Sequence, residues 1–433
     1  MSLTEDTFHR IRAERAARFK RLYLPEEFIA PHYEGYSIAN LAASVIQVLG
    51  GRPPRAPLAP ELLESLTDGV RRVVLVIVDA LGYDRLTTAL NTNPHNGFHH
   101  LLHRGGRLAP LTSVFPSTTT AALTSLWCGY TPAEHGSLGF QLFLRGFNLR
   151  ANMINLNATA LQKMGGEQLV GAGLEPEKFL GVPSLPQALA RVGVPTYNLI
   201  EQPFEKSPLS RVQIRGVRET RGFVTSSDMW VALRNWMEQR ARDKALFVAY
   251  WSAVDTIAHT YGPSSDTLLA EINSFAYSFE REFLRPLSAA AREHTLFLLT
   301  ADHGHIDSPP DRAVYLKDHP DLREHLLMDY TGEPRAAYLY CTQGEVDVVR
   351  AYFEKRLPDK FFVLDSQLAL ALGLFGGGTP APEARYRVGD LTVLGRSNYY
   401  LWEKHEAPRP LGRHGGLSEA EMLVPLLAAR LDG

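Results

Sequence analysis

Apolar runs that close on polar residues recur along the chain, and segments with helical periodicity lie between them. The run at residues 73–78 is apolar throughout and closes on Asp79. A strand that is apolar on both faces is typical of a parallel sheet covered by helices. Strands are predicted at residues 73–78, 108–115, 196–200, 246–251 and 295–300.

Helical segments show apolar residues at spacings of three and four. The clearest, residues 37–50, carries Ile38, Leu41, Val45 and Leu49 on one face and ends at two glycines. Helices are predicted at residues 37–50, 121–127, 185–192, 229–242 and 267–284, with a last one starting near Ser418. Strands that alternate with helices predict an α/β fold, a doubly wound and mostly parallel sheet with helices on both faces.

The stretch 113–139 joins a predicted strand to a predicted helix and carries four consecutive hydroxyl residues. These are Ser117, Thr118, Thr119 and Thr120, and the helix after them ends at Gly129. The start of a helix favours an anion because its first backbone N–H groups and its dipole point outward there. The junction therefore predicts an anion site or, more simply, a Ser117 or Thr118 hydroxyl that caps the helix.

The pattern changes between residues 308 and 409, which indicates an inserted subdomain. Strand, helix and strand patterns follow one another there, and a Gly/Pro-rich loop separates them from two further short strands. We expect three parts: an N-terminal helical extension packed on the core (1–60), a core (61–307 and 410–433) and an inserted α+β subdomain (308–409).

The composition is that of an ordinary globular protein. The 433 residues are 45% hydrophobic and 21% charged, with a formal net charge of −2 at pH 7. This near-neutral balance gives no electrostatic reason to expect nucleic-acid or membrane binding. The charged N-terminus lacks the apolar centre of a signal peptide, and we expect a cytoplasmic location. The two cysteines, Cys128 and Cys341, provide neither a disulfide framework nor a thiolate metal cluster.

Acidic and histidine side chains gather at four places along the chain: Asp79, Asp255 with His259, Asp302 with His303, and His414. Each has a simpler interpretation by itself, as a helix cap, a chance spacing or a surface histidine. In an α/β sheet, however, functional residues meet beyond the carboxyl ends of the strands, so we expect convergence beside the hydroxyl junction. Nitrogen and oxygen ligands without sulfur suit one or two divalent ions, zinc first and manganese or iron after it. Two such ions can clamp an in-line displacement at phosphorus.

These motifs resemble those of the alkaline phosphatase superfamily, and most closely its nucleotide pyrophosphatase/phosphodiesterase branch. They are Asp79 after an apolar strand, then FPSTT, CGYTPAEHG, YWSAVDTIAHTYGP, LLTADHG and a late RHGG. In the family a Thr lies three residues after a Pro and ten before the Gly that opens a G-x-x-P-x-x-H-G turn, a position that corresponds to Thr119. The resemblance implies two sets of zinc ligands: Asp255, His259 and His414 for one ion, and Asp79, Thr119, Asp302 and His303 for the other.

The resemblance also implies a metal-dependent hydrolase of phosphodiester or pyrophosphate bonds. Thr119 would attack phosphorus, and water would then hydrolyse the phospho-threonine intermediate. The expected partner is a small phosphate ester or nucleotide, with no nucleic acid and no membrane. A phosphomonoesterase or phosphonate hydrolase on the same scaffold is the enzyme alternative, and a non-catalytic metal-binding regulatory domain is the alternative from another class.

The chain departs from the family pattern at Phe140. That branch usually has an Asn five residues after the His of the HG turn, where it supports a phosphate oxygen, and this position is Phe140 here. Support is then expected from the backbone N–H of Thr120 or from the side chains of Asn152 or Asn155. Three phenylalanines are candidates to stack a nucleobase, although their spacing fits core packing better: Phe140, Phe143 and Phe147.

Overall fold

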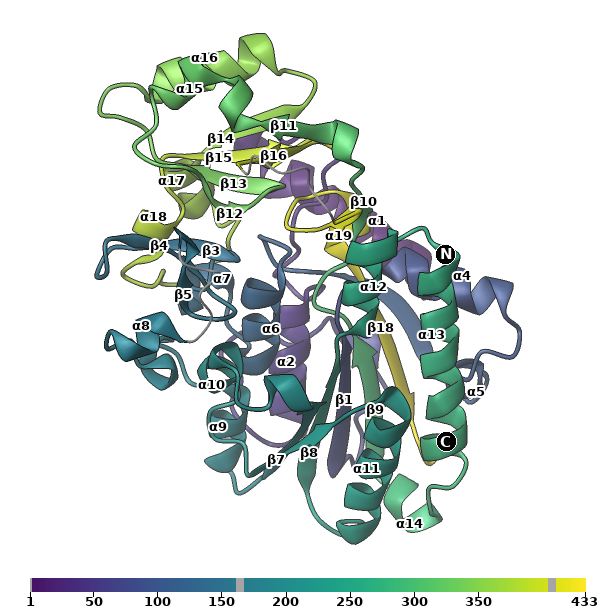
Figure 1. Cartoon of the computed structure of the whole chain (residues 1–433). Helices are drawn as coiled ribbons and strands as arrows, with labels where there is room; N and C mark the ends of the chain where they lie inside the picture. Colours follow the sequence, from purple (N-terminus) through teal and green to yellow (C-terminus); the bar gives the residue numbers. More distant parts are fainter. Residues whose placement is uncertain (1, 161–166, 404–409) are drawn as a thin grey trace.

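The central element of the fold is a sheet of seven strands (Figure 1). The computed structural model describes residues 2–160, 167–403 and 410–433. In spatial order the strands are β2 (Arg107–Thr112), β18 (Leu423–Arg430), β9 (Thr295–Thr300), β1 (Arg72–Val78), β8 (Ala245–Trp251), β6 (Thr196–Glu201) and β7 (Glu219–Phe223). Strands β1, β6, β7, β8 and β9 pair in parallel, so their carboxyl ends lie at one edge. The predicted α/β class with a mostly parallel sheet is confirmed.

The last element of the chain differs from the prediction. Residues 423–430 form strand β18, which pairs antiparallel with β2 and β9, and only a short helix, α19 (Glu419–Met422), precedes it. The predicted helix starting near Ser418 is thus present as α19, but it ends at Met422, and the chain closes with a strand. A short apolar run fits a buried helix or a buried strand equally well, and here two unpaired strand edges accept it. Pro425 lies opposite Pro110, so two residues without an N–H group face each other.

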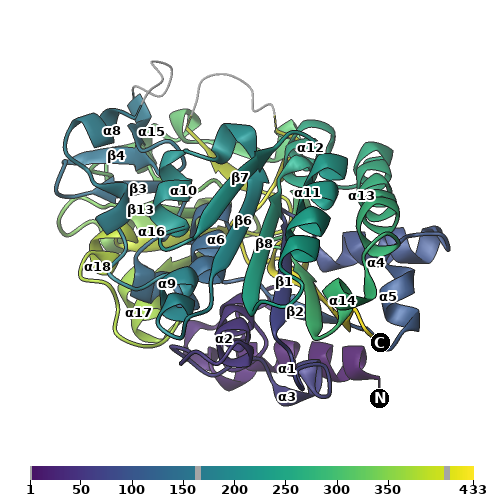
Figure 2. The ribbon, with the colours of Figure 1, turned by 90° about the horizontal axis from the view of Figure 1, so that it is seen from below.

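Helices cover both faces of the sheet, as Figure 2 shows in the view from below. Helices α2 and α6 pack together on one side, and α11, α12 and α13 pack on the other. In chain order the helices up to α14 are α1 (Leu3–Ala17), α2 (Ile38–Val48), α3 (Pro60–Leu63), α4 (Tyr83–Thr92), α5 (His99–His103), α6 (Thr119–Cys128), α7 (Pro132–His135), α8 (Gln168–Gly171), α9 (Leu185–Ala190), α10 (Pro208–Gln213), α11 (Ser226–Gln239), α12 (Ala253–Tyr261), α13 (Asp266–Ser278) and α14 (Ala289–Arg292). None of the helices in the described part of the chain is both long and apolar enough to span a bilayer.

A second, antiparallel sheet lies beyond the carboxyl ends of the first sheet (Figure 1). Its strands in spatial order are β14 (Phe361–Asp365), β15 (Leu391–Gly395), β13 (Ala336–Leu339), β12 (Thr331–Glu333), β3 (Gln141–Leu144), β4 (Leu149–Asn152) and β5 (Asn157–Ala158). Its helices are α15 (Pro320–Arg323), α16 (Val346–Arg356), α17 (Ser366–Ala371) and α18 (Ala384–Arg387). Three of its strands come from residues 141–158, ahead of the expected insert 308–409, and residues 404–409 of that insert lie outside the described residues.

Two short ribbons connect this second sheet with the edge where the parallel strands end. Strand β10 (Ile306–Asp307) pairs with β17 (Gly412–Arg413), and β11 (Ala313–Tyr315) pairs with β16 (Tyr400–Trp402). The first ribbon brings the chain after β9 against the chain before α19. It therefore places residues 303–305 and 412–414 side by side.

Candidate active site

The predicted site residues converge beyond the carboxyl ends of the parallel strands. Asp79 follows β1, Asp255 and His259 lie on α12 after β8, and Asp302 and His303 follow β9. Thr119 is the first residue of α6, and His414 follows β17. The structure brings these residues into two adjacent groups, one with Asp79, Asp302 and His303, the other with Asp255, His259, His305 and His414. Within each group one ligand atom per residue lies within 4.8 Å of the others.

Thr119 belongs to the first group by its side chain. Its Oγ1 lies 3.1 Å from His303 Nε2. The same nitrogen lies 3.5 Å from Asp79 Oδ1 and 3.4 Å from Asp302 Oδ2. One hydroxyl, one imidazole nitrogen and two carboxylate oxygens therefore point to a common volume.

Each of the two carboxylates keeps one oxygen available. Asp302 Oδ1 accepts hydrogen bonds from the backbone N–H groups of Ala80 and His303 at 3.1 and 2.9 Å. Asp79 Oδ2 accepts one from the hydroxyl of Tyr250. The remaining oxygens, Asp79 Oδ1 and Asp302 Oδ2, are buried and have no hydrogen-bond partner among the described residues. A buried, unpartnered carboxylate oxygen is costly unless a cation binds it.

Three histidines are oriented by their Nδ1 atoms. His303 Nδ1 donates to the carbonyl of Gly304 at 3.1 Å, His259 Nδ1 to Gly412 at 2.8 Å and His414 Nδ1 to Ser117 at 3.2 Å. Because a carbonyl oxygen only accepts, the proton of each neutral ring must lie on Nδ1. Nε2 is then left with a free lone pair, which is the arrangement of metal-binding histidines.

The second group contains a histidine that the sequence interpretation missed. His305 Nε2 donates to Asp255 Oδ1 at 2.8 Å, while His259 Nε2 lies 3.4 Å from the same oxygen. His305 follows His303 by two residues in the motif ADHGH, and this second histidine was the available signal. The rings of His303 and His414 stack 3.9 Å apart, so the two groups are in contact.

The electrostatics of both groups favour bound cations. Burial and the nearby charges of Asp302 and Asp255 raise the pKa of Asp79 well above its usual value. Burial also lowers the pKa of His414 well below its usual value, which keeps the ring in the neutral form that binds metals. For Asp255, burial favours the neutral form, but His259 and His305 outweigh it and the pKa is lowered. The donor set and its unpartnered oxygens fit divalent ions.

The hydroxyl residue before Thr119 has a different environment. Thr118 is the N-cap residue of α6, but its Oγ1 donates to Glu333 Oε1 at 2.5 Å instead of capping the helix. Burial raises the pKa of Glu333 to about 8, which favours the protonated form of this carboxyl at neutral pH. Of these two hydroxyls, that of Thr119 contacts His303 in the first candidate metal-ligand group, whereas that of Thr118 is bonded to Glu333.

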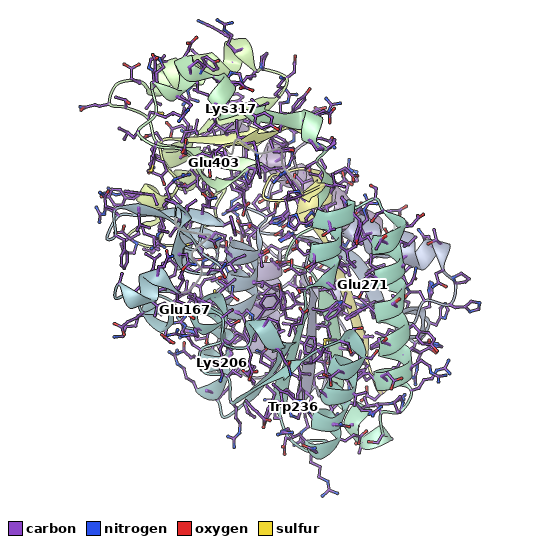
Figure 3. All side chains as sticks on the ribbon, in the orientation of Figure 1. Glu167, Lys206, Trp236, Glu271, Lys317 and Glu403 are labelled. Atoms are coloured by element: carbon purple, nitrogen blue, oxygen red, sulfur yellow. The ribbon has the colours of Figure 1, made fainter. Side chains whose placement is uncertain are left out.

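Two cavities open beside Thr119, and we name each by one lining residue. The Arg413 cavity, of about 250 Å³, is lined by Thr118, Thr119, Phe140, Gln141, Ile154, Asp255, His259, Tyr330, Glu333, Pro334, Trp402, Glu403, Pro410, Arg413 and His414. The Trp127 cavity, of about 140 Å³, is lined by Asp79, Thr119, Leu123, Trp127, Ile154, Ile200, Phe204, Ser207, Leu209, Ser210, Gln213, Ile214, Tyr250, Ser252, Asp255 and Thr256. Thr119, Ile154 and Asp255 border both. Figure 3 labels Glu403, which lies on the side of the second sheet.

The sequence profile of type I phosphodiesterases / nucleotide pyrophosphatases matches residues 73–417. The chain belongs to this family. The match covers the strands β1, β8 and β9 and every residue of the two metal-ligand groups. Membership of this family indicates a phosphoester hydrolase. Members of the family use divalent metal ions. A comparison with curated proteins gives no match.

Solved structures of the same fold include phosphodiesterases and a phosphonate hydrolase. Murine ectonucleotide pyrophosphatase / phosphodiesterase 5 is 19% identical, with a TM-score of 0.61 over 82% of this chain and 87% of that chain. The human protein of the same name is 17% identical, with a TM-score of 0.60 over 82% and 87%. Phosphonoacetate hydrolase from Sinorhizobium meliloti 1021, in complex with phosphonoformate, is 18% identical, with a TM-score of 0.59 over 83% and 90%. At these identities the likeness concerns the fold.

The residues expected to support a phosphate oxygen in this phosphodiesterase-family chain lie in different places. Phe140 lines the Arg413 cavity, between α7 and β3. Asn152 is buried at the end of β4, and its Oδ1 accepts from the backbone N–H groups of Ile154 and Asn155 at 2.9 and 3.3 Å. Asn155 is exposed, and neither Asn is among the described residues that line the two cavities. Thr120 lies in the first turn of α6, whose positive end faces the site.

The other two phenylalanines considered for base stacking pack in the second sheet. Phe143 lies on β3 with its ring 5.7 Å from that of Tyr340, and both Phe143 and Phe147 pack against the hydrophobic core. Phe143 and Phe147 thus lie in a strand and in the turn after it, and their spacing reflects core packing. Glu333 and Arg413, which line the Arg413 cavity, were not singled out from the sequence. Nothing in the local pattern of Glu333 distinguishes it, and in the motif RHGG, which contains Arg413, only His414 was assigned a role.

Proposed function

We propose that this protein hydrolyses phosphodiester or pyrophosphate bonds, with Thr119 as the nucleophile and two divalent ions as cofactors. Asp79, Thr119, Asp302 and His303 would hold one ion, and Asp255, His259 and His414 the other. Zinc is the first candidate and manganese the second, because the ligands are nitrogen and oxygen atoms only. Bound ions would lower the pKa of the Thr119 hydroxyl and neutralise charge on the leaving oxygen.

The position of Thr119 supports its role. Its Oγ1 is 3.1 Å from His303 Nε2, and it starts α6, whose positive end stabilises negative charge on a phosphoryl group. In the first step Oγ1 bonds to phosphorus, the bond to the leaving oxygen breaks, and the hydroxyl proton passes to solvent while the leaving oxygen gains one. In the second step water displaces Oγ1 from phosphorus and the hydroxyl is restored.

One observation favours a diester over a monoester. Two separate cavities meet at Thr119, and a phosphorus atom held there can carry one substituent into each. A monoester has only one substituent and would leave one cavity empty. The group that leaves would occupy the Arg413 cavity, since this cavity is bordered by His259 and His414.

The proposal is tested with an aryl phosphodiester and the matching aryl monoester, each assayed before and after chelation. We expect the diester to be turned over at least about tenfold more efficiently than the monoester, which corresponds to about 1.4 kcal/mol of transition-state binding. Chelation should abolish both activities, and zinc or manganese should restore them. The Asp302→Asn variant, which lacks one proposed metal ligand, is purified in the same way, and its residual activity gives the contribution of contaminating phosphatases. Turnover that survives chelation would overturn the metal mechanism, and faster turnover of the monoester would overturn the diester assignment.

A further inference from the structure

Arg413 is a buried cation at the wall of the cavity that adjoins the proposed nucleophile. Arg413 is only 6% exposed, and its backbone in strand β17 pairs with Ile306 of β10. It precedes His414 directly, and both line the Arg413 cavity together with Thr119. The paired strands β10 and β17 therefore position the side chain of Arg413 at the wall of this cavity.

The guanidinium of Arg413 has hydrogen-bond donors to spare. Among the described residues, its Nε and Nη2 atoms are buried and have no hydrogen-bond partner. Burying a charged donor without a partner is costly, and an arginine fork is most strongly satisfied by a carboxylate or a phosphate.

Two other buried arginines in the described part of the chain, Arg72 and Arg335, do not share this feature. Arg72 donates to several main-chain carbonyls and to Thr295 Oγ1 at 3.0 Å. Arg335 forms two hydrogen bonds with Glu421, at 2.8 and 2.7 Å. The fold thus satisfies these two guanidinium groups, whereas that of Arg413 keeps two nitrogens without a hydrogen-bond partner among the described residues.

The surroundings of Arg413 hold the guanidinium in place and leave room for an anion. Its guanidinium carbon lies 4.1 Å from the ring centre of Tyr400 and 4.6 Å from that of Trp402. Stacking on aromatic rings orients the planar group. Glu333 lines the same cavity, and burial raises its pKa to about 8, which favours its neutral form and weakens its repulsion of an anion.

We propose that Arg413 binds an oxyanion carried by the leaving group, so that the enzyme selects diesters whose leaving group is itself anionic. This inference rests on the proposed function, because it assigns one end of the proposed substrate. The oxyanion is a phosphate or a carboxylate, since both match the arginine fork. Arg413 is thereby a specificity-determining residue on the leaving-group side, and the Trp127 cavity receives the other substituent.

The experiment compares three diesters that share one phenyl substituent and differ in the leaving phenol. The phenols carry a neutral carboxamide, a carboxylate or a non-hydrolysable phosphonate in the same ring position. We expect kcat/KM for the better anionic substrate to exceed that of the carboxamide by at least about tenfold, and the better of the two identifies the anion. Equal values for all three would overturn the assignment of Arg413. Failure to cleave any of them would instead refute the proposed function.

Binding of the three free phenols to the metal-loaded protein, measured by calorimetry, tests the anion site without turnover. We expect the affinities of the three phenols to follow the same order as kcat/KM of the corresponding diesters. In Arg413→Met the ratio between the values for the anionic compound and for the carboxamide should fall close to one. In Arg413→Lys, which keeps the charge but loses the planar fork of donors, the ratio should fall only in part. Arg312→Met removes a positive charge from an exposed arginine stacked on Tyr399 and should leave the preference unchanged. Metal content is measured in each variant, because His414 is adjacent. A preference that persists in Arg413→Met contradicts the inference.

Discussion

The histidines around Thr119 receive their tautomer from main-chain carbonyls and not from a metal ion. Gly304, Gly412 and Ser117 each accept one Nδ1–H. Gly412 lies in strand β17, and Ser117 forms a β-bridge with Gly415. The lone pairs on Nε2 are thus oriented before any ion arrives, which reduces the ordering that binding requires. The same holds for Asp302, whose Oδ1 is occupied by two backbone N–H groups.

This local arrangement leads to a prediction for the two neighbouring threonines. Thr119→Ala should lower turnover of a diester by at least about a thousandfold, because the proposed nucleophile is removed, while metal content stays near that of the wild type. Asp79, Asp302 and His303 remain as ligands in that variant. Thr118→Val is the matched comparison, and its effect should be much smaller because the Thr118 hydroxyl is bonded to Glu333. Steady-state kinetics and elemental analysis provide the readouts. Equal losses in both variants would show that Thr119 is not the nucleophile.

At the scale of elements, the segment after β9 is held by a close contact between backbones. A Cβ atom at Gly304 would lie 2.1 Å from the carbonyl oxygen of Ala420 in α19 and 3.1 Å from the Cα of Gly82. No side chain fits there, so the chain between His303 and His305 can pass α19 only with a glycine. The requirement for glycine in ADHGH is thus a packing requirement imposed by the last helix.

Gly304→Ala should therefore displace the segment that carries His303 and His305. We expect a loss of about 1–3 kcal/mol in the free energy of unfolding, as for other overpacked sites, together with weaker metal binding. Chemical denaturation and metal titration measure the two effects. Gly146→Ala is the control, because a Cβ atom there meets nothing within 4 Å. If Gly304→Ala binds metal as tightly as the control variant, the contact with Ala420 does not position the site.

At the scale of the whole molecule, one buried ion pair links the two sheets. Arg335, in the turn between β12 and β13, pairs with Glu421 of α19, and both side chains are fully buried. Glu421 also accepts from the backbone N–H of Gly416 at 2.9 Å and from the Ser418 hydroxyl at 2.6 Å. The second sheet is thereby fastened to the segment that carries His414.

Removing one partner of this pair should be strongly destabilising. We expect Glu421→Gln to lose about 3–5 kcal/mol in the free energy of unfolding at pH 7, because Arg335 is left buried without its counter-charge. Glu383→Gln, which breaks the exposed pair with Arg145 at 2.8 Å, should cost less than about 1 kcal/mol. Urea unfolding of both variants measures the difference. Equal effects would mean that the buried pair does not hold the sheets together.

The effect of Glu421→Gln should also depend on pH. Burial raises the pKa of Glu421, but Arg335 outweighs it, so the pKa is lower in the folded than in the unfolded chain. A carboxyl with a lowered folded pKa stabilises the fold fully above its unfolded pKa, and this contribution is lost as the pH falls through the folded pKa. The difference between wild type and Glu421→Gln should therefore shrink on acidification. A difference that is constant with pH would contradict the ion-pair interpretation.

Much of this protein follows from its sequence, because the deciding signals are local. Apolar runs that close on polar residues predict β1, β6, β8 and β9, and helical spacing predicts α2, α9, α11 and α13. Since parallel strands end at a common edge, the same pattern also predicts that Asp79, Asp255 and Asp302 meet. The structure brings them together as two adjacent groups with His259, His303 and His414.

Contacts between distant segments decided the rest. Residues 423–430 became strand β18 because β2 and β9 offered unpaired edges, although an apolar run of that length fits a helix as well. Strands from residues 141–158 joined others 170 or more residues later in a second sheet, a pairing that no local pattern encodes. Glu333 and Arg413 acquire their significance from their places in the wall of the cavity beside Thr119, and His305 acquires its own from its contact with Asp255. The spacing of apolar residues indicates which face of a segment packs against the core. The environment of a buried charge, in contrast, is set by chain segments that lie far away in the sequence.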